Sequence, residues 1–171
     1  MTEKLVKTKK RVADVGEVFT PRWLVDEIIE TLPESLFEDS RKTFIDPACG
    51  NGNFLVEVIV KKRQRGATAL EALATTYGVD IMADNVVECR HRAFKAAIQG
   101  DDLNYHSESN LFKRFVKKRM LYRMRRLVHQ NIRHGDTLKF EMEDIFSTKP
   151  SEELINFRNE NQDFVALDSA G

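Results

Sequence analysis

Apolar residues recur along the chain in two patterns, short continuous runs and longer stretches with helical spacing. The short runs cover residues 43–45, 76–79, 131–133 and 164–167. Their β-branched and aromatic side chains predict four strands. Helical spacing occupies residues 54–62, 67–74, 83–98 and 111–130. This alternation predicts an α/β fold with a mostly parallel sheet and helices on its faces.

The region before the first strand predicts an arm and a helix. Residues 1–15 are rich in lysine and have no sustained apolar period, so we expect a flexible basic arm. Thr20 is predicted to cap a helix that begins at Pro21 and is closed by Pro33. Residues 16–171 are expected to form one domain, because a chain of 171 residues suffices for a single core.

Composition narrows the class of protein. The hydrophobic share of 42% and the charged share of 32% are typical of an ordinary globular protein. Cys49 and Cys89 cannot form the framework of a disulfide scaffold, and no signal-peptide pattern opens the sequence, so a cytoplasmic location is expected. No apolar run approaches the length of a membrane span.

The net charge of zero conceals an uneven distribution. Residues 1–110 carry a net charge of −3, residues 111–135 of +9 and residues 136–171 of −6. The predicted helix 111–130 combines an apolar stripe of Phe112, Phe115, Val116, Met120, Met124, Leu127 and Val128 with a basic face. That face is expected to bind nucleic acid or to be a solvated surface balanced by the acidic residues that follow. Its members are Lys113, Arg114, Lys117, Lys118, Arg119, Arg123, Arg125 and Arg126.

A glycine-bearing turn follows the first strand. Gly50 and Gly52 lie between strand and helix, where backbone can approach a ligand, and Asp80 ends the next strand. The dinucleotide fingerprint has a third glycine and about 20 residues before its acid, so an NAD site is not expected. The pair Cys89 and His91 lacks the ligand count of a zinc site, so no metal is expected.

Four motifs together resemble the DNA adenine-N6 methyltransferases, in the gamma-type order. DPACGNGNFL at residues 46–55 resembles their S-adenosylmethionine loop, and GEVFTP at residues 16–21 resembles the segment before it. YGVDI at residues 77–81 resembles the ribose-binding strand end, and HGD at residues 134–136 the motif after it. The resemblance implies a Rossmann-like class I methyltransferase fold, doubly wound, with residues 111–130 as an inserted basic helix and S-adenosyl-L-methionine as cofactor.

The resemblance also implies a role for individual residues. Asp46 would attract the methionine ammonium, and Gly50 and Gly52 would leave room for the cofactor. Asp80 would hold the ribose hydroxyls, unless it only caps the next helix, and Asp136 would accept from the adenine amino group, unless it is only a turn acid. Phe19, Thr20, Ala48 and Ile81 would complete the site, the first two beside the methionine and Ile81 on the adenine face.

The fourth motif departs from the family pattern. Asp168 keeps the acceptor expected for the catalytic position, but Ser169, Ala170 and Gly171 follow it instead of two prolines and an aromatic residue that stacks on a flipped base. We therefore expect a sheet that is incomplete on its C-terminal side, and a homodimer or complementary chain that covers the strand 164–167. Three functions stay open: the cofactor-binding part of a DNA adenine methyltransferase, an inactive relative that binds the cofactor or a partner, and a nucleic-acid-binding module.

Overall fold

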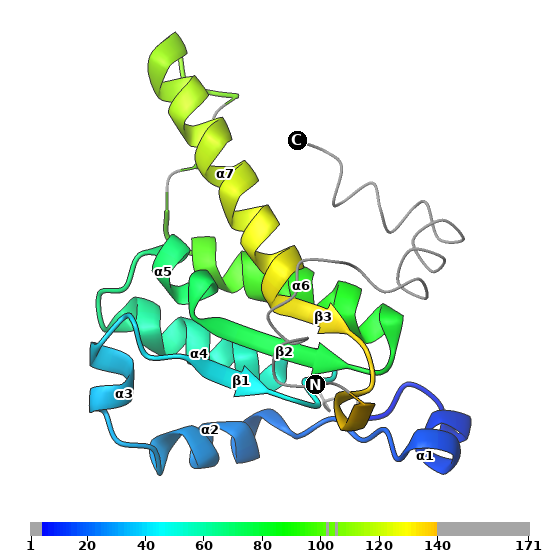
Figure 1. The fold of residues 1–171 in the computed structure, drawn as a ribbon. Helices are drawn as coiled ribbons and strands as arrows, with labels where there is room; N and C mark the ends of the chain where they lie inside the picture. The colour runs from blue at the N-terminus through cyan, green and yellow to red at the C-terminus, as the bar shows by residue number, and fades with distance from the viewer. Residues whose placement is uncertain (1–4, 102, 105, 140–171) are drawn as a thin grey trace.

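The computed structural model places three parallel strands side by side in the order β1-β2-β3 (Figure 1). The structure describes residues 5–101, 103–104 and 106–139. β1 spans Phe44–Asp46, β2 Thr76–Asp80 and β3 Ile132–His134. Phe44 is in register with Thr76, and Gly78 with Ile132. Three predicted strands and their parallel pairing are confirmed, whereas the predicted strand 164–167 lies outside the described residues.

The four helices predicted from apolar spacing are present. α4 spans Asn53–Gln64, α5 Ala69–Ala74, α6 Ala83–Ile98 and α7 Leu111–Asn131. α5 begins with a capping box, in which the Thr68 side chain accepts from the Glu71 N–H and the Glu71 carboxylate accepts from the Thr68 N–H. These elements with the parallel sheet confirm the α/β class, and the doubly wound methyltransferase fold stays a prediction.

The N-terminal region differs from expectation in two respects. Helix α1 spans Lys9–Val15, with Thr8 as its N-cap, where the sequence predicts an arm without regular structure. Helix α2 spans Arg22–Glu30, and its N-cap is Pro21, which makes no side-chain cap hydrogen bond. Thr20 therefore does not cap this helix, because it precedes the cap position. A short helix, α3 (Ser35–Glu38), and a 3-10 turn, Thr137–Lys139, were not predicted.

Two hydrophobic clusters hold the elements together. The larger one joins β3 to one side of α4, α5 and α6 and to the C-terminal part of α7, with Leu55, Ile59 and Val86 fully buried. The smaller one joins α2 and α3 to α4 through Val25, Phe37 and Val58. Because α4 contributes to both clusters, the helix that follows the glycine turn is fixed on two sides.

Lys62 is a charged residue inside this packing. Its side chain is fully buried, and its Nζ donates to the Lys42 carbonyl at 2.6 Å and to the Thr75 hydroxyl. The ammonium lies 5.0 Å from the centre of the Phe44 ring. Burial lowers the pKa of Lys62 to about 8. Lys62 thereby links the segments that lead into β1 and β2.

Helix α7 is buried only near its C-terminal end. Met124, Val128 and Asn131 are its buried residues, and Figure 1 shows the rest of the helix projecting beyond the β3 side of the sheet. The predicted apolar stripe therefore does not pack along its whole length: Phe112, Phe115 and Val116 are exposed.

The buried end of α7 is anchored by polar contacts. The Arg90 guanidinium of α6 donates to the carbonyls of His129 and Ile132, at 2.7 to 3.1 Å. The Asn131 amide donates to the Leu73 carbonyl at 2.8 Å. Paired acceptors at a helix C-terminus stabilise its last turn, so the base of α7 is held while its N-terminal half extends from the body.

Candidate cofactor-binding site

The carboxyl ends of the three strands bring the predicted cofactor residues to one edge of the sheet. Asp46 ends β1, Asp80 ends β2, and Gly135 follows β3. The loop after β1 stays close to β2, since the Cys49 N–H donates to the Val79 carbonyl at 2.9 Å. The turn after β3 does the same, since the Gly135 N–H donates to the Asp80 carbonyl at 2.9 Å. In parallel α/β sheets this edge is where ligands bind.

The two loop glycines are required for different reasons. Both have positive φ values, 53° at Gly50 and 88° at Gly52, in the left-handed region. A Cβ at Gly50 would lie 3.2 Å from the Phe19 ring, whereas a Cβ at Gly52 would lie 2.5 Å from Sγ of Cys89. Gly52 is thus in close contact with α6. The space that its missing side chain leaves is filled by protein.

Asp80 is the polar centre of the edge. Its Oδ2 accepts from the Gly50 N–H at 2.8 Å, and its Oδ1 accepts from the Met82 N–H at 2.8 Å and from the Asn85 amide at 3.3 Å. The residue is 9% exposed. Asp80 therefore links the glycine loop to the start of α6, which goes beyond the local cap expected as the alternative.

Asp46 carries a carboxylate in a partly buried position. Burial raises the pKa of Asp46, the negative charge of Asp80 raises it further, and a hydrogen bond from the Ala48 N–H partly offsets both. A nearby cation would relieve this unfavourable environment. The arrangement suits an ammonium group, which is the role that the family resemblance implies for this residue.

Asp136 and Ile81 lie at the more open part of the edge. Asp136 accepts from the Leu138 N–H at 3.1 Å and pairs with Lys139, and the Lys139 ammonium lowers the pKa of Asp136. Ile81 is 49% exposed, and its carbonyl lies 2.9 Å from Nε2 of His134. An ionised acid and an exposed apolar side chain therefore lie close to one strand edge, and their contacts with an adenine stay a prediction.

The segment before α2 covers one side of the glycine loop. Phe19 is buried against Gly50, and its N–H donates to the Leu5 carbonyl at 2.7 Å. Thr20 is exposed, and its carbonyl accepts from the Asn53 amide at 2.7 Å. The structure therefore brings Phe19 and Thr20 to the glycine loop, through backbone contacts as well as the Phe19 ring.

A buried polar link beneath this segment was missed by sequence reasoning. The Asn85 amide donates to Oε1 of Glu17 at 2.7 Å as well as to Asp80. Glu17 also pairs with Arg11 at 3.2 Å. Oε2 of Glu17 and Oδ1 of Asn85 are buried and have no hydrogen-bond partner among the residues that the structure describes. The available signal was the position of Glu17 inside GEVFTP.

Ion pairs hold helix α1 and the segment before it against α6. Arg11 lies 2.8 Å from Asp84, and Lys7 lies 3.0 Å from both Asp84 and Glu88. Burial opposes ionisation of Asp84, but hydrogen bonds from Arg11 and Lys7 prevail and lower its pKa. Two basic residues of the predicted flexible arm are therefore bound to the start of α6.

The Cys49 thiol lies in the same loop and faces inward. Its contact with Cys89 and its burial raise the pKa of Cys49 well above the usual value of a thiol. Both cysteines are buried and unbridged. Cys49 is therefore a protonated packing residue, since a thiol nucleophile needs a lowered pKa.

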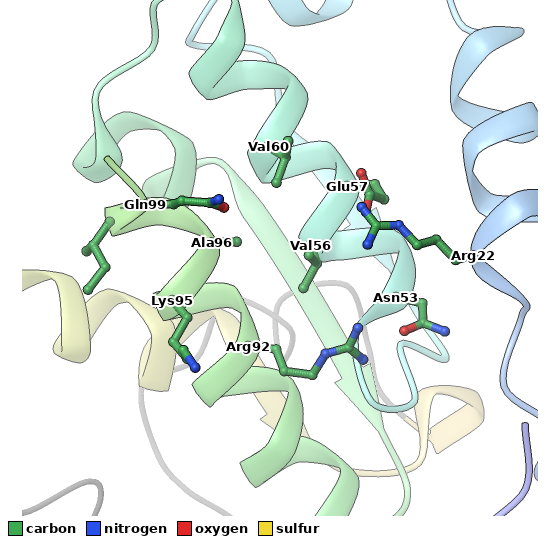
Figure 2. Close-up of a pocket in the computed structure, with 10 residues that line it drawn as sticks. Arg22, Asn53, Val56, Glu57, Val60, Arg92, Lys95, Ala96 and Gln99 are labelled. Atoms are coloured by element: carbon green, nitrogen blue, oxygen red, sulfur yellow. The ribbon is translucent and has the colours of Figure 1, made fainter. Parts of the chain in front are cut away.

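A separate cavity of about 880 Å³ lies between α4 and α6. Figure 2 shows Arg22 beside Glu57, and Arg92 extending from α6 toward Asn53, with the apolar Val56 and Val60 on α4. Arg22 pairs with Glu57 at 2.8 Å, and Arg92 donates to the Asn51 carbonyl at 2.8 Å. None of the predicted cofactor residues lines this cavity, so it is distinct from the strand edge.

The residues predicted to bind nucleic acid all lie on α7, at a different place from the strand edge. Lys117 pairs with Glu108 at 3.4 Å, and the Arg125 guanidinium lies 5.7 Å from the Phe94 ring centre. Asp168, the predicted catalytic residue, lies outside the described residues. Among the residues that the structure describes, no group of three or more His, Cys, Asp or Glu side chains is arranged to hold a metal ion.

A comparison with protein families decides the assignment. The model of the N-6 DNA methylase family matches residues 3–151, which is most of the chain. This chain belongs to the N-6 DNA methylase family. No match is found among curated proteins or among solved structures. In the described part of this N-6 DNA methylase, no helix has the length and apolarity needed to cross a membrane.

Membership supports methyltransferase function and a DNA substrate, and the family generally uses S-adenosylmethionine. The matched range contains the glycine loop, the Asp80 strand end and the HGD turn.

Proposed function

We propose that this chain is the cofactor-binding part of an S-adenosylmethionine-dependent DNA adenine-N6 methyltransferase. The observation that carries the proposal is the hydrogen bond from the Gly50 N–H to the Asp80 carboxylate. It joins the glycine loop to the acid of the next strand at the ligand-binding edge of a parallel sheet. The family match supports the class of reaction.

The bound cofactor would supply an activated methyl group, and the residues of this chain would hold and orient it. Asp46 would pair with the methionine ammonium, which compensates for its buried charge. Protein donors take three of the about four lone-pair sites of the Asp80 carboxylate, so Asp80 would hold the ribose hydroxyls with the site that remains. Ile81 and Asp136 would contact the adenine face and amino group, while Phe19, Thr20 and the Ala48–Gly50 backbone would enclose the methionine half.

Transfer to an adenine amino group also needs acceptors that orient the amine and a surface that stacks on the extruded base. Asp168 is the proposed amine acceptor of this chain. Since no aromatic residue follows it, the proposal includes a complementary chain, or a second copy, that contributes to the substrate side. That partner would cover residues 164–167.

A second candidate is a methyltransferase-derived protein that binds the cofactor, a nucleic acid or a protein without catalysis. The observation that favours it is the sequence Asp168-Ser169-Ala170-Gly171, which lacks both prolines and the aromatic residue of the family pattern. Loss of the stacking ring would weaken base binding by about 1 to 3 kcal/mol.

Two measurements test the proposal. Calorimetry with S-adenosylmethionine and its demethylated product tests the cofactor site, and absence of binding at millimolar ligand would reject it. Transfer of a tritiated methyl group to mixed-sequence DNA tests catalysis. We expect slow or no methyl transfer by the chain alone. Cofactor binding without methyl transfer, whether or not a complementary chain is present, would favour the second candidate.

A further inference from the structure

Helix α7 has an outward face that no described element covers and that mixes aromatic with cationic side chains. Phe115, Arg119, Tyr122 and Arg126 recur at intervals of three or four residues, so they share one side of the helix. All four are exposed, with Phe115 at 60% and Tyr122 at 68%. We call these four residues the outward stripe.

The outward stripe lies opposite the side by which α7 is attached. Met124, Val128 and Asn131 are the buried residues of the helix, and each follows a stripe residue by nine positions: Phe115, Arg119 and Tyr122 respectively. Nine residues are about 2.5 turns, which places each pair on opposite sides of the helix axis. The stripe therefore points away from α5 and α6, and it extends over about 17 Å of helix.

The charge of α7 indicates which kind of partner the outward stripe would bind. Helix α7 contains eight lysine and arginine residues and no acidic residue, so this surface attracts a polyanion. Exposed aromatic rings at regular intervals between cations are the arrangement with which proteins hold single-stranded nucleic acid, because unpaired bases stack on the rings while phosphates contact the cations. A duplex offers no free base faces to such rings.

We propose that the outward stripe of α7 binds single-stranded DNA, with bases stacked on Phe115 and Tyr122 and phosphates bound by Arg119 and Arg126. This site is separate from the strand edge, and Figure 1 shows the helix extending away from that edge beyond β3. The single-stranded DNA would be held outside the region in which a methyl group is transferred. The proposal names DNA because the chain belongs to a DNA methylase family, but it does not depend on cofactor binding.

The test is fluorescence anisotropy of a labelled mixed-sequence oligonucleotide, as single-stranded DNA, duplex DNA and single-stranded RNA, without cofactor and at several salt concentrations. The single-stranded DNA is expected to bind more tightly than the duplex. Phe115→Ala and Tyr122→Ala should each weaken its binding by about 5- to 100-fold and leave the salt dependence unchanged. The double variant Arg119→Gln/Arg126→Gln should reduce the slope of log K against log salt by about 1.4.

Matched controls lie elsewhere on the surface. Trp23→Ala removes an exposed aromatic residue of α2, and Arg41→Gln removes an exposed cation before β1, so neither should change binding. Because the stripe is exposed, thermal melting should show all variants folded. Absence of binding, an unchanged affinity in the ring variants, tighter binding of the duplex, or RNA binding more than tenfold tighter than DNA would each overturn the proposal. Calorimetry with S-adenosylmethionine reports on the strand edge separately.

Discussion

The Gly50 N–H donates a 2.8 Å hydrogen bond to Oδ2 of Asp80, and this contact joins two segments that are 30 positions apart. It orients the first residue of the glycine turn and fixes the carboxylate that is proposed to meet the ribose. A backbone donor cannot be removed by a side-chain substitution, so the acid is the residue with which to test the contact.

Asp80→Ala is expected to weaken S-adenosylmethionine binding by about 1.5 to 3 kcal/mol, the scale for losing hydrogen bonds to a charged group. Calorimetry measures this loss. Asp101→Ala is the matched control, because that carboxylate pairs with Arg63 beyond the end of α6 and should leave affinity unchanged. Equal affinity of the Asp80→Ala variant and the unaltered chain would remove Asp80 from the site.

Gly52→Ala is expected to destabilise the fold more than Gly66→Ala. Both positions have positive φ, 88° and 95°, so both substitutions incur the left-handed penalty of about 1 to 2 kcal/mol. At Gly52 the new Cβ meets Sγ of Cys89 at 2.5 Å, whereas no atom of the described residues lies within 4 Å of a Cβ at Gly66. Overpacking at position 52 should lower the free energy of unfolding further, by about 1 to 3 kcal/mol, which urea unfolding measures. Equal losses would show that the contact with α6 has no energetic weight.

Glu17→Ala is expected to lower the free energy of unfolding by about 1 to 3 kcal/mol, because it leaves the buried Asn85 amide and Arg11 without this acceptor. Glu17→Gln keeps an acceptor oxygen and should lose less. Cofactor affinity should fall in the alanine variant, since Asn85 also contacts Asp80.

Glu88→Ala is the control for that link. Glu88 pairs with Lys7 nearer the surface, where an ion pair contributes about 0 to 1 kcal/mol. Thermal and urea unfolding compare the variants. The same loss for Glu17→Ala and Glu88→Ala would contradict a buried link between the N-terminal segment and the strand edge.

Lys62 is expected to make stability depend on pH in the alkaline range. Its pKa is about 8 in the folded chain and has an ordinary value of 10.5, so between these values the unfolded state binds more protons. The free energy of unfolding should therefore rise as the pH increases from 8 to 10.5. Lys62→Met should remove this rise and also lower stability, because the Lys42 carbonyl and the Thr75 hydroxyl lose their donor.

Urea unfolding at several pH values between 7.5 and 10.5 measures the effect. Lys61→Met is the matched control, because the adjacent Lys61 pairs with Glu34 outside the buried site and its loss should keep the rise. Parallel pH curves for the unaltered chain and the Lys62→Met variant would contradict the assignment.

The alternation of strands and helices was predictable because it is written in local patterns. Residues 76–80 and 83–98 have apolar periods that match their observed elements. The residue types of the glycine turn likewise restrict the backbone conformations that this turn can adopt. The family motifs likewise predicted that Asp46, Gly50 and Asp80 lie in one site. The structure then brought them to one edge, because parallel strands present their carboxyl ends together.

Contacts between distant segments were decided only by the tertiary structure. The pairing of Glu17 with Asn85 spans 68 positions, and no local period reveals which of several acidic residues will be buried beside an amide. The requirement for glycine at position 52 depends likewise on where α6 places Cys89.

Helix α7 shows most clearly which properties the sequence determines and which the tertiary structure determines. Its sequence determined that a helix forms and that it is basic, because spacing and charge are properties of the chain itself. Which side of the helix is buried was decided by its attachment through Met124 and Val128 near one end, which leaves Phe115 and Tyr122 in solvent. An apolar residue becomes part of the core only where another surface meets it, and that meeting is fixed by the packing of the whole domain.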